Sequence, residues 1–335
     1  MFIVNSYMLA VVLCFVTMLC WGSWGNTQKL AAKTWRYELF YWDYVLGIVL
    51  FSIIMGLTLG SIGNGGRSFI PDLMQVSASN FGSAFLGGII FNASNILLSA
   101  AVSLAGLSVA FPVGVGLALV LGVFINYFGA PYGDPVTLFL GVGLIVVALV
   151  FNGIAYGKMS KGKDKSTSKK GLWIAISAGF LMSFFYRFVA AAMDLENFES
   201  PTPGMATPYT AVFIFSLGIL FSNFFFNTLL MKKPFVGAPV TYKSYFSGNI
   251  KTHTVGLLGG IIWCLGTSLS YLATGEAGAA ISYALGQGAT MVAAFWGVFI
   301  WKEFKGSSKS VNLLLFLMFL LFTSGLALII IAGNS

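Results

Sequence analysis

Polar side chains recur at helical spacing inside two apolar segments of this sequence. In one segment they follow i, i+3, i+7 and i+11, at Asn92, Asn95, Ser99 and Ser103. In the other they follow i, i+3, i+7 and i+10, at Cys264, Thr267, Tyr271 and Thr274. This spacing places each set on one helix face. Such a face either hydrogen-bonds to neighbouring helices or binds a polar solute. We expect solute binding for the asparagines, because each carries two donors and an acceptor that need partners.

Further candidates lie in other apolar segments. Tyr283 and Gln287 share a helix face that either packs or touches a solute. Arg187 either reaches the nearer membrane surface or faces a cavity and binds an anionic or hydroxylated solute, and we expect the cavity. Trp21 either belongs to an interfacial belt or stacks on a sugar or a flat heterocycle. The predicted solute-binding residues are Trp21, Asn92, Asn95, Arg187, Thr267, Tyr271, Tyr283 and Gln287.

The remaining reactive side chains do not predict catalysis. Glu276, in a short turn between two apolar segments, is the best candidate for coupling transport to an H⁺ or Na⁺ gradient. The chain has one histidine, His253, and its three cysteines lie in apolar runs without paired spacing. No nucleophile with a base and no metal-ligand cluster is evident. We therefore expect no enzyme activity, no metal and no cofactor.

One stretch resembles a nucleotide-binding motif in part. Residues 157–164 read GKMSKGKD, which fits G-x-x-x-x-G-K but has Asp164 where a phosphate-binding loop has Ser or Thr. A phosphate-binding loop also follows a strand, whereas this stretch follows an apolar segment. We interpret it as a basic linker and not as a nucleotide site.

Membrane-spanning helices must position these residues. The 335 residues are 58% apolar and 8% charged, whereas soluble domains have about 25% charged residues. A spanning helix needs about 20 mainly apolar residues. Ten segments qualify, at 5–24, 42–60, 82–104, 107–128, 136–156, 172–192, 209–231, 254–273, 277–300 and 311–332. Because lipid offers the backbone no hydrogen-bond partners, we predict an all-α polytopic membrane protein of ten transmembrane helices.

The basic residues predict how these helices are oriented. Sixteen of the 18 Lys and Arg residues lie in loops after the first, fifth, seventh and ninth segments, and Arg67 lies in a loop on the other side. Basic loops stay in the cytoplasm, so both termini are predicted to be extracytoplasmic. The net charge of +8 then reflects orientation and contact with lipid headgroups, and no nucleic-acid partner is expected.

An internal repeat relates the two halves of the chain. Residues 87–116 and 259–288 match at a constant offset of 172, with ten identical positions of which five are glycine pairs. The match predicts a five-helix repeat over 1–156, a basic cytoplasmic linker over 157–171, and a second repeat over 172–335. Because five is odd, the second repeat is inverted. Inverted repeats are common in secondary transporters, whose site lies near the bilayer midplane between the repeats.

Three stretches carry a family resemblance: CWGSWGNTQK at 20–29, GGIIFNASN at 87–95 and GLSVAFPVGVGLALVLGVFINYF at 106–128. Together with ten spans in two inverted repeats, they resemble the drug/metabolite transporter superfamily, and within it the glucose/ribose uptake permeases and the ureide permeases. The resemblance implies a carrier for small polar metabolites, sugars in one branch and ureides in the other, commonly driven by a cation gradient. It also leads us to expect a bacterial inner (plasma) membrane.

The first functional hypothesis is a secondary transporter that imports a small polar metabolite, a sugar, by alternating access with cation symport. The solute would lie between the first, third, fourth, sixth, eighth and ninth spans. One alternative is a ureide, purine or nucleoside permease in which aromatic stacking dominates. Another is an exporter of small amphiphilic metabolites, against which the polar stripes argue.

Overall fold

Helices make up nearly all of the regular structure in the computed structural model, which describes residues 1–32, 35–63, 65–159 and 165–334. In chain order the elements are α1 (Tyr7–Ala31), α2 (Tyr37–Leu57), α3 (Phe69–Gln75), α4 (Ala78–Ala105), α5 (Leu107–Ala110), the π-helix η1 (Phe111–Val115), α6 (Gly116–Gly129), α7 (Pro135–Met159), α8 (Lys165–Ala190), α9 (Pro208–Lys232), α10 (Tyr242–Phe246), α11 (Ile250–Gln287), α12 (Ala289–Phe295), the π-helix η2 (Trp296–Ile300) and α13 (Lys309–Ala332). Gly162, Lys163 and Asp164 of the partial phosphate-binding motif lie outside the described residues.

The starts of the helices follow from local sequence. Ser6, Ser77 and Asn249 precede α1, α4 and α11, and each side chain accepts a hydrogen bond from the backbone N–H three residues later. Such N-caps satisfy one of the N–H groups that a helix start leaves without a partner. Pro208 opens α9, where its missing N–H costs nothing.

The number of spanning helices differs from the prediction. The described residues contain nine helices that are long and apolar enough to cross a membrane, and not ten. One of the nine, Ile250–Ile300, runs through two predicted segments, 254–273 and 277–300. A straight helix of that length would measure about 76 Å, more than twice the roughly 30 Å hydrocarbon core of a bilayer. The helix is not straight, because it breaks at Gly278, where the backbone leaves the helical region.

Gly106 and Gly278, which match in the internal repeat, share one backbone conformation. Gly106 ends α4 with φ 88° and ψ 162°, and Gly278 breaks α11 with φ 70° and ψ 160°. Glycine is the residue that adopts positive φ without steric cost. At both places the chain therefore reverses within very few residues, where the sequence predicted tight turns between spans.

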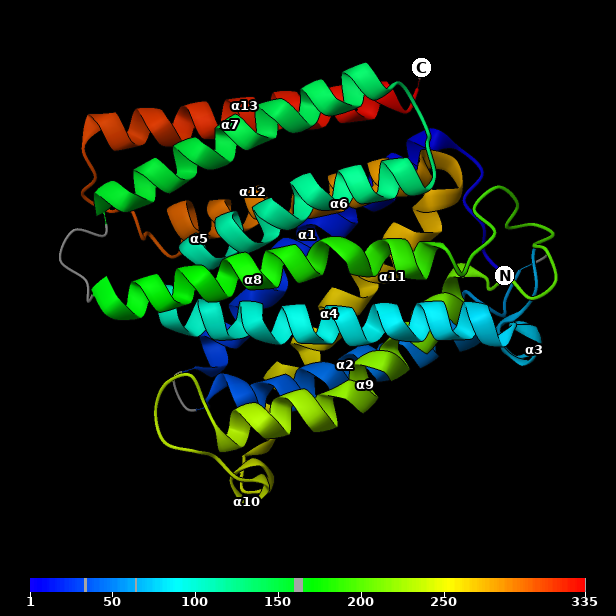
Figure 1. Ribbon diagram of the computed structural model, residues 1–335, viewed down its shortest axis with the longest axis horizontal. Coiled ribbons are helices and arrows are strands. Elements are labelled where there is room, and N and C mark those ends of the chain that lie inside the picture. The colour runs from blue at the N-terminus through cyan, green and yellow to red at the C-terminus, as the bar shows by residue number, and fades with distance from the viewer. Residues whose placement is uncertain (33–34, 64, 160–164, 335) are drawn as a thin grey trace.

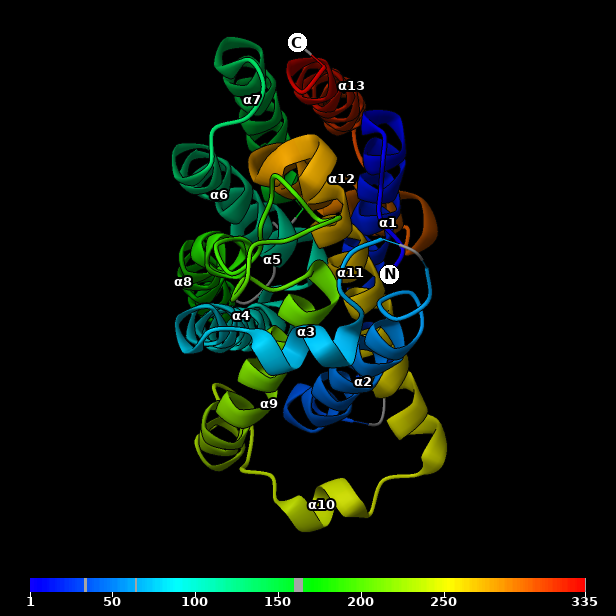
Figure 2. The ribbon, with the colours of Figure 1, turned by 90° about the vertical axis from the view of Figure 1, so that its right-hand side faces the viewer.

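Helix pairing also relates the two halves. α4 packs against α8 and α9, α11 packs against α1 and α2, and α7 lies beside α13 (Figures 1 and 2). In the predicted repeat, each helix of one half corresponds to the helix five spans further along the chain. When every helix in these pairs is exchanged for its counterpart, the same set of pairs results, as a two-fold relation requires. Gly88 and Gly260, equivalent in the repeat, lie against backbone of α9 and α2, where a Cβ would clash. Small residues of this kind let membrane helices approach closely. The inverted repeat itself stays a prediction.

The bundle has two distinct ends. Both termini, α3 and the 191–207 loop lie at one end, which we call the terminal end (Figure 1). The helix ends carrying Lys29, Lys158 and Lys232 lie at the other, which we call the basic end. α7 and α13 expose many large apolar side chains along their length, as a lipid-facing surface requires. The chain is an integral membrane protein, and which end faces the cytoplasm stays a prediction.

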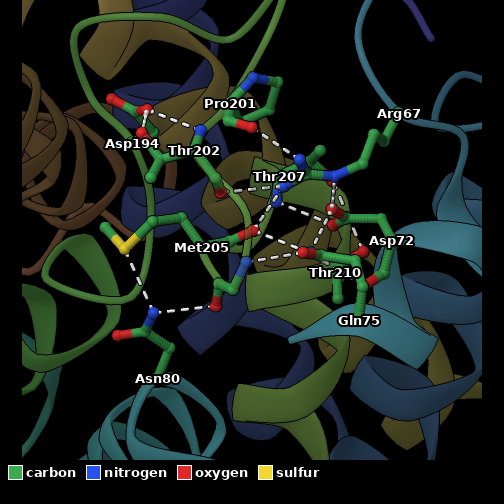
Figure 3. A network of polar contacts seen from close by, with 11 residues as sticks. Arg67, Asp72, Gln75, Asn80, Asp194, Pro201, Thr202, Met205, Thr207 and Thr210 are labelled. Atoms are coloured by element: carbon green, nitrogen blue, oxygen red, sulfur yellow. Dashed lines mark hydrogen bonds and ion pairs between the residues drawn. The ribbon is translucent and has the colours of Figure 1, made fainter. Parts of the chain in front are cut away.

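A polar network ties the loops together at the terminal end (Figure 3). Arg67 donates to Asp72 Oδ1 at 2.8 Å and to the carbonyl of Met205 at 2.6 Å. The buried Asp72 also accepts the Thr207 N–H at 2.8 Å. Burial would raise the pKa of Asp194, but hydrogen bonds from the backbone and hydroxyl of Thr202 hold that pKa below its ordinary value. The α3 segment and the 191–207 loop therefore form one connected cap.

Candidate functional site

A small cavity lies between α1, α4, η1, α8, α11 and α12, which are the elements between which the sequence places the solute. Its wall is mainly aromatic and apolar, with two primary amides and no charged side chain. The lining residues are Trp21, Trp24, Phe91, Asn95, Leu98, Phe111, Val115, Met182, Phe185, Trp263, Gln287 and Ala289. We call this the central cavity. Such a wall suits a neutral solute with flat apolar faces and a few polar groups.

Two tryptophans and a phenylalanine are stacked in the wall of the central cavity. The Trp263 ring stacks on Phe91, with centroids 4.2 Å apart, and on Trp21, with centroids 6.0 Å apart. Thr267 holds this arrangement, because its hydroxyl donates to the Trp263 carbonyl at 3.0 Å and accepts the Trp21 indole N–H at 3.1 Å. Thr267 therefore acts on the cavity by orienting Trp21.

The two amides enter the central cavity from different halves of the chain. Asn95 lies on α4 and donates from Nδ2 to the Tyr41 hydroxyl at 3.3 Å. Gln287 is the last residue of α11, beside the start of α12. A primary amide offers both a donor and an acceptor. Each can therefore pair with a solute group that presents a carbonyl next to an N–H.

The central cavity is nearly filled in this conformation. The volume open to the centre of a water molecule is about 20 Å³, enough for about one water. A larger solute would have to displace wall side chains. In this conformation the central cavity has no room for such a solute.

Three fully buried tyrosines lie beside the central cavity, where two of them contact the ring of Phe185 in its wall. Tyr186 and Tyr271 stack with centroids 4.3 Å apart and planes 16° apart, and Tyr283 tilts against Tyr186 at 5.1 Å. The Tyr186 hydroxyl bonds to Ser270 at 2.8 Å, and the Tyr283 hydroxyl donates to the Ala118 carbonyl at 3.0 Å. We call these three residues the tyrosine cluster.

A larger space opens at the basic end. It has a volume of about 620 Å³ and lies between α1, α2, α4 and the 233–241 loop; we call it the vestibule. Gln28, on the side toward the central cavity, donates from Nε2 to the Ser99 carbonyl at 3.0 Å. Along α4, Asn95 lines the central cavity and Ser103 lines the vestibule, with Ser99 between them. The predicted polar stripe therefore leads from one space to the other.

The predicted site residues fall into three groups. Trp21, Asn95 and Gln287 line the central cavity, and Thr267 orients Trp21. Tyr271 and Tyr283 belong to the tyrosine cluster. Asn92, Arg187 and Glu276 lie elsewhere.

Asn92, Arg187 and Glu276 each contact a different part of the protein. The Asn92 side chain donates to the Ser222 hydroxyl of α9 at 2.9 Å. The Arg187 side chain packs over Gly129 at the end of α6. Glu276 is half-buried at the terminal end, where its carbonyl accepts the Tyr132 hydroxyl at 2.8 Å. Solute binding by Asn92 and Arg187, and ion coupling by Glu276, stay predictions.

Most aromatic residues in the wall of the central cavity were not among the predicted site residues. Phe91 and Trp263 are equivalent under the offset of 172, and they stack on each other. Equivalent residues meet when they lie on the axis that relates two repeats. The matched GGII-F and GGII-W stretches each end in an aromatic residue, and this pair could have predicted the aromatic wall. The candidates were chosen mainly for polarity, so Phe91 and Trp263 were not among them.

Two buried carboxylates on α2 are also absent from the predicted site residues. Glu38 is fully buried and pairs with Arg36 at 2.5 Å. Asp43 is buried and accepts the Tyr245 hydroxyl at 2.6 Å, with His253 Nδ1 at 2.9 Å. Asp43 ties α2 to α10 and α11 through partners distant in sequence, whereas the Glu38 carboxylate pairs with Arg36, two residues earlier.

Comparison with known proteins identifies relatives along the whole chain. The family model for ureide permease matches residues 40–170 and 157–332. Ureide permease 1 of Arabidopsis thaliana is 25% identical over 389 residues, covering 100% of this chain and 99% of the relative. Probable ureide permease A3 of Vigna unguiculata is 22% identical over 367 residues, covering 90% and 96%. These relatives are plant proteins and lend no support to a bacterial membrane.

A solved crystal structure shares the fold. It aligns over 95% of this chain and 97% of its own, with a TM-score of 0.58 and 16% sequence identity. At that identity the likeness concerns the fold alone. The glucose/ribose permeases and the wider superfamily, to which the sequence motifs also point, do not appear among these findings.

Proposed function

This chain belongs to the ureide permease family, a family of membrane transporters and not of enzymes, and from that premise we propose that it carries a small, flat solute of the ureide class. The observation that carries this proposal is the central cavity, with stacked aromatic faces around two primary amides. The comparisons favour this reading, an alternative at the sequence level, over the sugar that was expected first.

The chemistry of the central cavity supports a cyclic ureide. Such a ring is flat, so Trp21 and Trp263 can cover its faces. Its edge alternates N–H and C=O groups, which Asn95 and Gln287 can each meet with one donor and one acceptor. A sugar carries a hydroxyl on most ring carbons, and each hydroxyl left without a partner in a closed site costs about 1–3 kcal/mol. Two amides cannot pair with all the hydroxyls of a sugar.

The two ends of the central cavity support alternating access. The tyrosine cluster closes it toward the terminal end, while toward the vestibule we find the hydrogen bond of Gln28 with Ser99. A carrier must expose its site to one side at a time. We propose that the opposite conformation parts the tyrosine cluster and closes the vestibule. The proposal includes coupling of solute transport to a cation gradient, which uptake with and without that gradient measures.

Uptake into proteoliposomes tests the proposed function. The full chain is reconstituted, and uptake of labelled hydantoin (a cyclic ureide), a purine base and glucose is followed with and without a proton or sodium gradient. We expect saturable hydantoin uptake that exceeds glucose uptake. Asn95→Ala should raise KM for hydantoin about tenfold, the value of one lost hydrogen bond of about 1.4 kcal/mol.

Ser268→Ala is the matched control, because this buried serine neighbours Thr267 but does not line the central cavity. Equal effects of the two substitutions would show that Asn95 only packs. Saturable glucose uptake without hydantoin uptake would restore the sugar hypothesis.

A further inference from the structure

The vestibule has the size of a binding site. Its volume of about 620 Å³ falls within the roughly 300–1,000 Å³ of small-molecule pockets, whereas the central cavity is nearly filled. It is lined by flat rings, Trp35, Tyr37 and Phe235, and by the polar side chains of Gln28 and Ser103. The same combination of rings and polar groups lines the central cavity.

The wall of the vestibule is held in place by cationic side chains. Arg36 donates from Nη2 to the Val236 carbonyl at 3.0 Å and from Nη1 to the Ala238 carbonyl. The fully buried carboxylate of Glu38 fixes that guanidinium at 2.5 Å. Charge-assisted bonds of this kind are about twice as strong as neutral ones. The 233–241 loop is therefore a preformed wall.

Several polar atoms around the vestibule lack partners. Gln28 Oε1, Trp35 Nε1, the Tyr37 hydroxyl and Glu303 Oε2 are buried and have no hydrogen-bond partner among the described residues. Gln28 is 2% exposed and Trp35 is 7% exposed. Proteins leave few buried polar groups unpaired, because each costs about 1–3 kcal/mol. These side chains all line one space, and a ligand that carries both N–H and C=O groups would offer them partners.

The charged side chains described around the vestibule form ion pairs. Lys29 pairs with Glu303 at 2.7 Å, and Arg36 pairs with Glu38 behind the wall. Each cation among the described lining residues is thus compensated. A neutral ligand can enter without breaking an ion pair.

We propose that the vestibule is a second binding site for a small, flat, neutral solute with N–H donors and carbonyl acceptors. The inference rests on the proposed function, because it assigns the same chemical class to both spaces. The polar stripe of α4 joins them: Ser103 lies about 12 Å along the helix from Asn95. A solute leaving the central cavity passes Gln28 and pauses between Trp35 and the 233–241 loop.

Binding stoichiometry tests the proposal. The full chain is purified in detergent, and labelled hydantoin is bound by equilibrium dialysis. We expect two molecules per chain with two dissociation constants. Trp35→Phe keeps a flat ring and removes an indole N–H that bonds to no described residue, so it should weaken one constant about tenfold. Asn95→Ala should weaken the other.

Trp42→Phe is the matched control. Trp42 does not line the vestibule, and its indole N–H points to Met231 on α9. It should leave both constants unchanged. Gln28→Met provides a second vestibule variant if Trp35→Phe yields no folded protein by size exclusion.

Two other outcomes are distinguishable. A single bound molecule, lost in Asn95→Ala and unaffected by Trp35→Phe and Gln28→Met, would overturn the vestibule site and leave the proposed function standing. No hydantoin binding to the wild-type chain would overturn the proposed function, and the vestibule site with it.

Discussion

The terminal end and the basic end close the central cavity by different means. Toward the terminal end, the rings of Tyr186, Tyr271 and Tyr283 pack against one another and are fully buried. Toward the basic end, the bond from Gln28 to the Ser99 carbonyl lies beside an open vestibule of about 620 Å³. The chain therefore has a thick closure on one side and a thin one on the other.

The difference indicates which closure opens at lower cost. Parting stacked, buried rings exposes a large apolar area and loses about 0.5–1.5 kcal/mol per aromatic pair beyond that area. Breaking one hydrogen bond costs about 1 kcal/mol net. The loops beyond the tyrosine cluster are also cross-linked through Arg67 and Asp72. We infer that this conformation exchanges solute with the basic end.

The largest expected effect concerns access to the two ends. In a chain whose native cysteines are replaced, Ser103→Cys lines the vestibule and Ser270→Cys lies against Tyr186. A water-soluble thiol reagent should modify the first on the order of 100-fold faster, since the second reacts only in rare openings. Labelling rates by mass spectrometry measure the ratio. Equal rates would mean that the terminal end opens as easily.

A smaller effect separates the two equivalent glycines. Gly278→Ala and Gly106→Ala both force alanine into a positive-φ conformation, which costs about 1–3 kcal/mol. At the terminal end the new Cβ would also meet the Tyr132 ring at 2.6 Å, whereas near Gly106 it meets nothing closer than 4.0 Å. Gly278→Ala should therefore lose about 2 kcal/mol more stability. Thermal unfolding in detergent tests this order, and a reversed order would contradict it.

A third effect tests the hydrogen bond within the tyrosine cluster. Tyr186→Phe leaves the buried Ser270 hydroxyl without its 2.8 Å partner, so we expect a loss of about 1 kcal/mol. It should also raise labelling of Ser270→Cys in the double variant. Unchanged stability and labelling would show that the rings alone close this end.

The smallest effect on stability is expected at Tyr271, which stacks on Tyr186. The Tyr271 hydroxyl is buried without a partner among the described residues, so Tyr271→Phe removes no hydrogen bond and keeps the stack. Its midpoint of unfolding should match the wild type or rise slightly. A loss as large as that of Tyr186→Phe would show that the hydroxyl gains a partner in another conformation of the transport cycle.

The amino-acid sequence by itself determined the helical bundle and two of its chain reversals. Long apolar runs must become helices in lipid, and the matched glycines Gly106 and Gly278 mark both reversals. Trp21, Asn95 and Gln287, which the sequence predicts to bind the solute, line the central cavity, and solute binding by them stays a prediction. Residue type selected these candidates, and helical spacing grouped the polar ones on shared faces.

Only the tertiary structure decided which neighbour each face meets. Asn92 and Asn95 share a helix face, yet one contacts Ser222 on α9 and the other lines the cavity. Tyr283 and Gln287 share a face, yet one joins the tyrosine cluster and the other the wall. Helical periodicity fixes directions around one axis. How each helix is turned against its neighbours follows from the packing of the whole bundle, which no single segment encodes.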